Sequence, residues 1–390
     1  MLNELKVLEL ASVLAGPSVG QFFAELGAEV IKIENLHTGG DVTRTWKLPG
    51  ENTDDRSSYF CSVNWGKKSI ALDLNTPEGR TIVYDLAKKS DIVVASYKPG
   101  DAEKLGVDYD ALSALNPQLI YGQITGFGSG TPRVGYDAVI QAEAGFMFMN
   151  GEPQGSSLKM PVALMDVIAA HHLKEGILLA MLQKGKTGKG DFIEVSLLQA
   201  AIASLANQAT NWLVAGMIPQ KQGSAHPNIA PYGDIFTTAD GHEILLAVGS
   251  DRQFQTLCSI LGKADLATEP EFRVNASRVK NRISLNVILS DLFKTRLLNY
   301  VTQLLLDANI PYGILRNMQE VFSMNEAQSL LIHSEDRIGV KTFVASNFQS
   351  TSSHFLPPPH FGEHTKEILL QSLEMPIEDV NSLLERHVII

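Results

Sequence analysis

The chain has 390 residues, 44% of them hydrophobic, which is more than one ordinary domain needs and enough to bury a large core. Acidic residues outnumber basic ones by 43 to 32, giving a net charge of -11 without a long run of like charge, so we expect no nucleic-acid partner. Two widely separated cysteines, Cys61 and Cys258, indicate neither a disulfide framework nor a metal site.

The N-terminal residues lack the basic flank and the small-residue cleavage site of a signal peptide. No run of about 18 apolar residues occurs anywhere in the chain. We therefore expect a cytoplasmic protein that does not contact a membrane.

The first predicted elements are a buried strand at 6–10, a helix at 16–26 and a second strand at 29–34. This order predicts a parallel, doubly wound α/β sheet. The glycines Gly16, Gly20 and Gly27 do not fit the G-x-G-x-x-G dinucleotide fingerprint. Glu34, at the end of the second strand, could still bind a ribose hydroxyl, which keeps an NAD-dependent oxidoreductase open as an alternative.

An irregular segment at 37–58 contains Arg44 and Trp46, which serve either an active-site loop or surface packing. The strand and helix alternation then resumes with a strand at 69–74, a helix at 78–89 capped by Thr76, and strands at 91–97 and 119–125. Tyr136 precedes an apolar helix at 137–149. It either contacts a ligand at the carboxyl edge of the sheet or covers the core.

The stretch 159–201 places one acid, Asp166, between a short apolar run and a helical pattern that extends to about Gln183. Gly185, Gly188 and Gly190 then indicate a turn, and 192–198 alternates like a strand. Asp166 is either the N-cap of this helix or a carboxylate that the helix N-terminus keeps ionised as a nucleophile.

A change of pattern follows a predicted helix at 202–217. Residues 232–248 predict a hairpin with a tight turn at Asp240 and Gly241, and helical patterns follow up to Ala308. We predict a large domain from 1–200 and 326–390, a linker at 201–224 and a small α+β domain at 225–325. The short C-terminal part cannot bury a core alone, so we expect it to pack on the large domain or on a partner chain.

Several catalytic motifs are absent. The glycine and lysine run at 185–190 leads from a helix into a strand, the reverse of a P-loop. His171, His172 and Glu175 lack the spacing of a zinc helix, and no G-x-S-x-G elbow occurs. Metal-dependent and serine-type hydrolysis are therefore not indicated, and we expect no bound metal.

Several runs, in order and over nearly the whole chain, resemble the class III CoA-transferase family, which includes formyl-CoA transferase, carnitine CoA-transferases and α-methylacyl-CoA racemases. They are ASVLAGPSVGQFFAELGAEVIKIE, DVTRTW, NWGKKSIALDLNTPEG, GYDAVIQAEAG, Asp166 followed by KTGKGDFIEVSLL, PYGDIFTTADG and GEHT. Three segments, ATNWLVAG, GSAHPNIAPYGDIF and IPYGILRNMQEVF, most resemble the succinate-hydroxymethylglutarate (glutarate) CoA-transferases.

The resemblance implies a Rossmann-like large domain built from both chain ends, a smaller α+β domain and an interlocked homodimer. It implies that CoA moves from an acyl-CoA donor such as succinyl-CoA to a small, dicarboxylic acid through an aspartyl-CoA thioester on Asp166. CoA would be a substrate, without a permanently bound cofactor. The alternatives are an α-methylacyl-CoA racemase or epimerase, and a non-catalytic acyl-CoA-binding homologue. The racemase branch needs a His next to the position of Tyr136 and a Glu near the position of Asp251. This chain has Tyr136 at the first and a shorter acid at the second, so the imidazole base is missing.

The resemblance also implies which residues contact CoA: Val13, Leu14, Ala15, Leu72, Tyr97, Lys104 and Tyr136. Asn35 and Asn75 stand where formyl-CoA transferase has basic residues, so Arg44, Arg133 or Lys104 would bind the phosphates instead. Backbone N–H groups near Gly135 or after Gly223 would stabilise an oxyanion. Trp46 and the lid residues Gly223 and His226 would contact the acceptor acid, with His226 pairing with its distal carboxylate.

Overall fold

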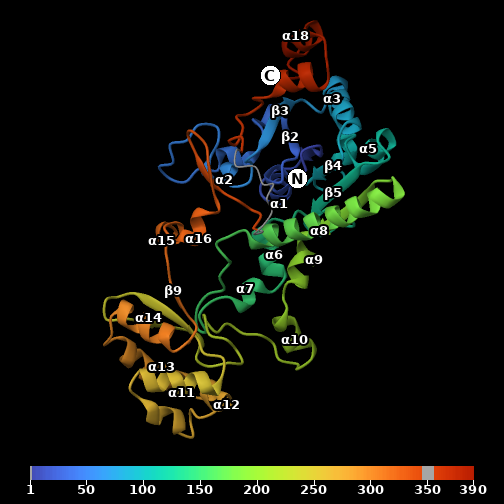
Figure 1. The fold of residues 1–390 in the computed structure, drawn as a ribbon. Helices are drawn as coiled ribbons and strands as arrows, with labels where there is room; N and C mark the ends of the chain where they lie inside the picture. Colours follow the sequence, from blue (N-terminus) through green and yellow to red (C-terminus); the bar gives the residue numbers. More distant parts are fainter. Residues whose placement is uncertain (1, 345–354) are drawn as a thin grey trace. The chain divides into compact units, whose positions relative to one another are not determined.

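The computed structural model describes residues 2–344 and 355–390. The chain forms two compact units (Figure 1). The first comprises residues up to 145, 160–215 and 329–390, and the second comprises 146–159 and 216–328. Residues 201–215, at the start of the predicted linker, therefore belong to the first unit.

The first unit is built on a six-stranded parallel sheet with the strand order β3-β2-β1-β4-β5-β6. Its strands are β1 (Lys6–Leu10), β2 (Glu29–Asn35), β3 (Lys67–Leu72), β4 (Ile92–Ala95), β5 (Ile120–Thr125) and β6 (Asp191–Ser196). The prediction of an α/β fold with a parallel sheet is confirmed. The order reverses between β1 and β4, which is the topological switch point of a doubly wound sheet.

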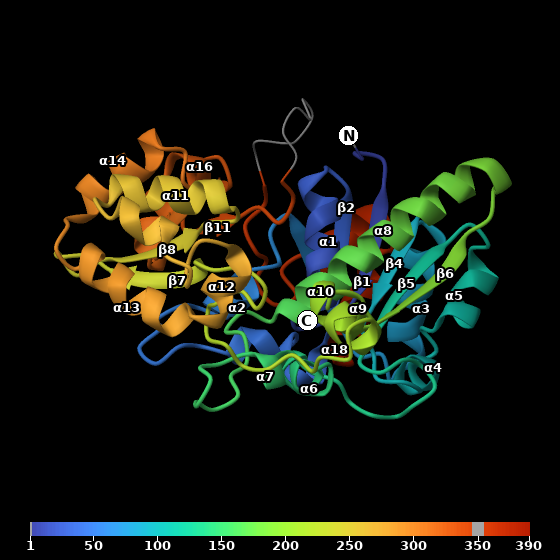
Figure 2. The same cartoon turned by 90° about the horizontal axis from the view of Figure 1, so that it is seen from below.

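Alternating residues of the strands face opposite sides, and both sides are covered. Leu8 and Ile31 share one core with α3 (Pro77–Lys88) and α5 (Tyr109–Leu115). The other face is covered by α1 (Ala15–Glu25) and the long helix α8 (Leu164–Thr187), which pack on each other and on the sheet (Figure 2). The carboxyl ends of the strands are thus held on a rigid scaffold.

The C-terminal part completes the core of this unit. Its elements are α17 (Thr365–Glu367), the π-helical turn Ile368–Ser372 and α18 (Ile377–Glu385). Leu369 and Leu383 are buried in the same core as β1–β4, and Ile389 forms a bridge with Leu72. A short antiparallel pair, β10 (Leu331–His333) and β11 (Ile338–Val340), precedes these elements.

Three predicted helices differ from the observed ones. The helix that carries Asp166 continues through Gly185 and ends at Thr187, where Gly188 adopts a left-handed φ of 69°. The predicted helix at 137–149 is interrupted at Gly145 (φ 86°), giving α6 (Asp137–Glu143) and α7 (Phe146–Met149). The one predicted at 202–217 is two helices, α9 (Leu197–Ala203) and α10 (Asn207–Leu213), separated by Ala206 at φ 49°.

The remaining elements of the first unit are short. They are the 3-10 turns Leu36–Thr38 and Val42–Thr45 and the helices α2 (Ser58–Cys61) and α4 (Asp101–Leu105). The segment predicted as an irregular loop at 37–58 is therefore almost free of regular structure. No helix in the described part of the chain has the length and apolar character needed to cross a bilayer.

The second unit contains the predicted antiparallel hairpin. A three-stranded sheet is formed by β7 (Tyr232–Thr237), β8 (Glu243–Ala247) and β9 (Tyr312–Ile314). The helices are α11 (Asp251–Ile260), α12 (Asn275–Lys280), α13 (Arg282–Phe293), α14 (Leu298–Asp307), α15 (Met318–Phe322) and α16 (Asn325–Gln328), with a 3-10 turn at Ala264–Thr268. Phe236, Phe254 and Phe293 lie in its separate core.

Candidate active site

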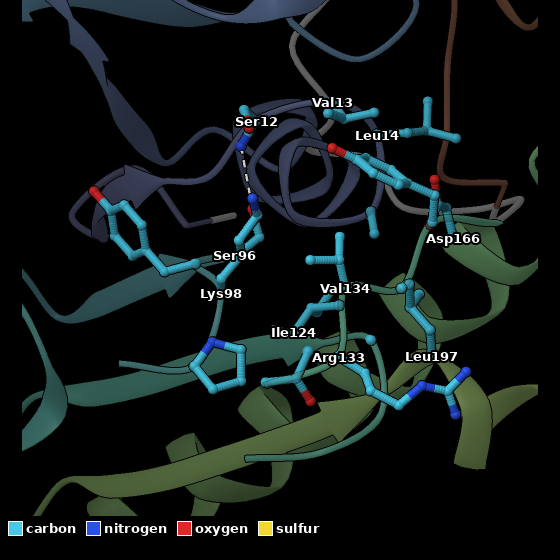
Figure 3. Close-up of a pocket in the computed structure, with 17 residues that line it drawn as sticks. Ser12, Val13, Leu14, Ser96, Lys98, Ile124, Arg133, Val134, Asp166 and Leu197 are labelled. Atoms are coloured by element: carbon cyan, nitrogen blue, oxygen red, sulfur yellow. Dashed lines mark hydrogen bonds between the residues drawn. The ribbon is translucent and has the colours of Figure 1, made fainter. Parts of the chain in front are cut away.

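A cavity of about 190 Å³ lies at the switch point of the sheet (Figure 3). The loop after β1 forms one wall, and the segment Ser96 to Pro99, which follows β4, forms another. The backbone N–H of Ser12 donates to Oγ of Ser96 over 3.2 Å, which ties the two strand ends together. Ligands of doubly wound folds bind at this position.

The cavity unites most of the residues that were predicted to bind CoA. Its lining residues are Ser12, Val13, Leu14, Ala15, Ser96, Tyr97, Lys98, Pro99, Ile124, Thr125, Gly126, Arg133, Val134, Gly135, Tyr136, Asp166 and Leu197. Gly126 and Gly135 approach so closely that a Cβ on Gly126 would lie 2.5 Å from the nitrogen of Gly135. Only glycine fits at this crossing, because any side chain would displace the loop that carries Tyr136.

Asp166 is the third residue of α8, and Ala163 occupies the N-cap position. The interpretation of Asp166 as the N-cap is therefore wrong. Its side chain reaches the cavity (Figure 3), although the residue is only 8% exposed. No hydrogen bond to its carboxylate is present among the described residues, so its oxygens are free to act on a ligand.

Burial and the neighbouring acid Asp137 both favour the protonated form of Asp166. Burial, and next the charge of Asp137, raise the pKa of Asp166 to about 7. One Asp137 oxygen accepts the N–H of Met165 at 2.9 Å, and the other accepts a side-chain hydrogen bond from Gln141 at 2.6 Å. Asp137 thus caps α8 from a neighbouring helix. From its position at a helix N-terminus, Asp166 was predicted to be ionised. Burial and the charge of Asp137 instead oppose its ionisation.

Asp137→Asn should shift the titration of the Asp166 carboxyl group to lower pH. If the Asp166 carboxylate attacks a ligand in this cavity, only its ionised form reacts, so the rate should fall about tenfold per pH unit below pH 7 in the unmodified protein. Removing the charge of Asp137 lowers the pKa of Asp166, so the decline should begin at lower pH. Asp110→Asn, on the exposed side of α5, is the matched control. An unchanged acid limb in Asp137→Asn would refute this coupling.

The loop after β1 is held by a buried network of charges. Val13 adopts a left-handed φ of 73°, a conformation that is strained for a β-branched residue. Both oxygens of Asp41 accept its N–H at 3.3 Å. Lys32 lies 2.9 Å from Asp41 and 3.0 Å from Glu9. The network therefore fixes a strained loop in the wall of the cavity.

A second cavity of about 400 Å³ adjoins the first at the ends of β1 and β2. Ser12, Ser96 and Tyr97 line both cavities. Asn35, which caps the following 3-10 turn through the N–H of His37, lines the second. The two cavities together offer an elongated site for a ligand longer than the first cavity alone accommodates.

Three residues predicted to bind CoA lie elsewhere. Leu72 is fully buried in the core and lines none of the cavities described. Lys104 is exposed on α4 and pairs with Asp101 at 2.9 Å. Arg44 is 3% exposed and donates to both oxygens of Glu34, so its guanidinium is committed to the protein and does not offer itself to a phosphate, contrary to the prediction.

Trp46 lines a third cavity of about 580 Å³, which borders the first turns of α8. Its ring stacks edge-to-face on Tyr59 with the centroids 5.1 Å apart. Gly223 and His226 belong to the second unit. Nδ1 of His226 accepts the N–H of Asn228 at 3.1 Å, and its ring packs on Tyr232.

Comparison with known proteins identifies the family of this chain. The family model described as CoA-transferase family III matches residues 2–365. The chain belongs to CoA-transferase family III. It is 38% identical to the succinate–glutarate CoA-transferase of Agrobacterium fabrum, with 95% of each chain covered. It is 36% identical to the succinyl-CoA:glutarate CoA-transferase of Homo sapiens, covering all of this chain and 90% of that one.

A solved structure of a CAIB/BAIF family protein from Brucella suis has a TM-score of 0.83 to this family III CoA-transferase. It is 37% identical, and the match covers 94% of this chain and 98% of that one. The predicted family and its enzyme class, a transferase of CoA, are therefore confirmed. No histidine lines the cavity around Asp166 in the described part of this CoA-transferase, so the imidazole base of a racemase is absent there.

Sequence reasoning did not identify two residues of this transferase that the structure places in or beside the site. Lys98 lines the cavity and follows the carboxyl end of β4. Ligands of doubly wound sheets bind at such strand ends, so this position in the sequence could have identified it. Asp137 was treated only as the start of a helix. Its proximity to Asp166 depends on how α6 and α8 pack, which no spacing in the sequence reveals.

Proposed function

We propose that this enzyme moves CoA from an acyl-CoA donor such as succinyl-CoA to a small dicarboxylic acid, through an aspartyl-CoA thioester on Asp166. The observation that carries the proposal is the carboxylate of Asp166, buried, without a hydrogen-bond partner and directed into the switch-point cavity. The relatives named succinate–glutarate and succinyl-CoA:glutarate CoA-transferase support the donor and acceptor class.

The chemistry proceeds by four exchanges at carbonyl carbon. The Asp166 carboxylate attacks the donor thioester, forming a mixed anhydride and releasing CoA as a thiolate. The thiolate attacks the Asp166 carbonyl, the anhydride C–O bond breaks, and the donor acid leaves. The acceptor carboxylate then attacks the aspartyl-CoA thioester, giving a second anhydride and the thiolate again. The thiolate finally attacks the acceptor carbonyl, forming the new acyl-CoA and freeing Asp166.

The protein contributes positioning and charge to these steps. The helix N-terminus of α8 and the N–H of Gly135 are the proposed donors to the developing oxyanion. Holding carboxylate, thioester and thiolate in one cavity supplies an effective molarity on the order of 10⁵ M. The buried site also keeps water from the anhydride, which would otherwise be hydrolysed.

For CoA, the loop at 13–15, Tyr97 and Tyr136 are the proposed contacts, because all of them line the cavity. Lys98 and Arg133 are the basic side chains that line it, so we assign the phosphates to them in place of Arg44. Arg133 is held by an ion pair with Glu143 and stacks on Phe127 at 3.9 Å.

Incubating the purified protein with succinyl-CoA and single carboxylic acids, followed by chromatography of the acyl-CoA products, tests this function. The expected result is glutaryl-CoA from glutarate, with one succinate released per transfer. Incorporation of solvent deuterium at the α-carbon of an acyl-CoA without exchange of acids would indicate a racemase instead. Binding of acyl-CoA with neither reaction would indicate a non-catalytic homologue.

We propose that the enzyme is a homodimer in which the two chains interlock. Support comes from α8, whose Leu179 and Leu182 are 67% and 68% exposed although the opposite side of the helix is buried. Leu213 and Val214, at the end of α10, are more exposed still. Covering such side chains is what a partner chain would do.

Light scattering on the purified protein should therefore give twice the 42.5 kDa mass of the chain. Leu179→Glu with Leu182→Glu should lower the yield of dimer, because each buried charge would face an apolar partner surface. Lys186→Glu, on the exposed end of the same helix, should leave the dimer intact. A monomeric mass for the unmodified protein would contradict the proposal.

A further inference from the structure

The third cavity is the largest of the three described and is mostly apolar. Its walls come from α1, from the segment Trp46 to Val63 and from one stripe of α8, namely Val167, Ala170, His171 and Lys174. Pro161, Val162 and Ala163, which directly precede α8, also line it. An apolar cavity that holds one cation selects a ligand with an aliphatic part and a single anionic end.

Lys174 is an unusual group in such a wall. The residue is 6% exposed, and its ammonium has no ion-pair or hydrogen-bond partner among the described residues. Its nearest favourable contact is the ring of Phe22, 5.3 Å from Nζ. Burying an unpaired ammonium costs several kcal/mol, a cost that proteins retain mainly at functional sites.

Glu25 is the acid whose charge acts on Lys174, but its carboxylate accepts hydrogen bonds from other residues. One of its oxygens accepts the N–H and the hydroxyl of Thr342, and the other accepts the N–H of Phe343. Burial lowers the pKa of Lys174 to about 8, and the charge of Glu25 opposes this only in part. At pH 7 the Lys174 side chain is therefore still protonated, and its ammonium can pair with an anion of the ligand.

The third cavity shares a lining residue with the cavity that Asp166 lines. Leu14 lines both this cavity and the one that holds Asp166. Tyr59 lines the third cavity and feels the charge of Asp166, which together with burial raises the pKa of its hydroxyl. Lys174 follows Asp166 by eight residues, about 12 Å along the helix axis, and long helical side chains point back toward the N-terminus. A ligand that contacts both groups therefore needs two anionic ends joined by a short aliphatic chain.

We propose that the third cavity is the acyl and acceptor subsite and that Lys174 binds the distal carboxylate of a dicarboxylate whose other carboxyl group reacts at Asp166. This inference rests on the proposed function and names its specificity-determining residue. It gives Lys174 the role that the sequence suggested for His226.

Glutarate and glutaramate, in which a neutral amide replaces the distal carboxylate, are the matched acceptors for the test. In an exchange through a covalent intermediate, kcat/KM for the acceptor acid depends only on the half-reaction between that acid and the intermediate. An effect of the substitution on the reaction with the donor therefore does not change the comparison of the two acceptors. Lys174→Met should lower kcat/KM for glutarate at least about tenfold, mainly through KM, and change that for glutaramate less than about twofold. Lys174→Arg should restore most of the preference, because it keeps the charge.

Lys186→Met, on the exposed end of the same helix, is the control and should keep the preference for glutarate. His226→Ala tests the rival assignment of the distal carboxylate, and this inference expects the preference to remain. Equal losses for both acceptors in Lys174→Met, or an altered dimer mass, would show a structural role and overturn the inference. A preference lost in His226→Ala instead would also overturn it. If the unmodified protein transfers CoA to neither acid, the proposed function itself fails, a result distinct from these.

Discussion

Asp166→Asn should lower kcat/KM for CoA transfer on the order of 10⁴-fold or more, because the proposed anhydride and thioester form on a carboxylate and an amide cannot replace it. Steady-state kinetics with succinyl-CoA and glutarate measure the loss. Asp137→Asn is the matched control, since it removes an adjacent acid and keeps the nucleophile. The mass of the variant should be checked, because deamidation of the new asparagine would restore the native residue.

Asp166→Asn should also stabilise the folded protein at pH 8. The pKa of Asp166 is raised from 3.8 to about 7, so between these values the unfolded chain is ionised while the folded protein holds a proton. Ionisation therefore counts against folding, most strongly above pH 7. Thermal unfolding should show a larger gain for Asp166→Asn at pH 8 than at pH 5. A variant that is both inactive and less stable would leave misfolding as the cause of the lost activity, and would contradict the burial argument.

Lys32→Met should reduce the free energy of unfolding by about 3–5 kcal/mol, because it leaves the buried Asp41 without a cation and Glu9 with Lys67 alone. Lys32 is 1% exposed, and its Nζ also donates to the carbonyl of Ala11 at 2.7 Å. Burial opposes its charge, but the charges of Asp41 and Glu9 outweigh this and raise its pKa. Urea unfolding at pH 7 measures the loss. The variant should also raise KM for acyl-CoA, since Asp41 would no longer be fixed against Val13.

Lys68→Met is the matched control on the neighbouring strand β3. Its ammonium pairs with Glu367 at 2.8 Å, but both groups are partly exposed, so the expected loss is about 0–1 kcal/mol. Similar losses in the two variants would show that the buried network contributes no more than a surface ion pair. The role of Asp41 and Lys32 in holding the loop would then be wrong.

The sheet and the position of the site were predictable because the signals are local. The strand at 6–10 is apolar and short, and the Thr76-Pro77 start of α3 follows from capping chemistry, which the observed hydrogen bond from the N–H of Gly79 to Thr76 confirms. Once the strand order is that of a doubly wound sheet, the ends of β1 and β4 must meet, and the ligand site follows.

The rest depends on packing between distant segments. Arg44 was predicted to bind phosphate because Asn35 and Asn75 replace basic residues of formyl-CoA transferase. In the structure its guanidinium donates instead to Glu34 and to the carbonyl of Pro359, a residue more than 300 positions away. The burial of Lys174 could not be predicted for the same reason. On a helix it looks like a solvated side chain, and only the packing of α1 against α8 buries it.

The account is tested most directly by mixing the protein with succinyl-CoA, quenching without an acceptor and measuring the mass of the peptide that contains Asp166. It predicts an increase equal to CoA minus one water on that peptide, located at Asp166, which disappears when glutarate is added and glutaryl-CoA is formed. Transfer that proceeds at full rate in Asp166→Asn, or an adduct that forms on another residue, would contradict it.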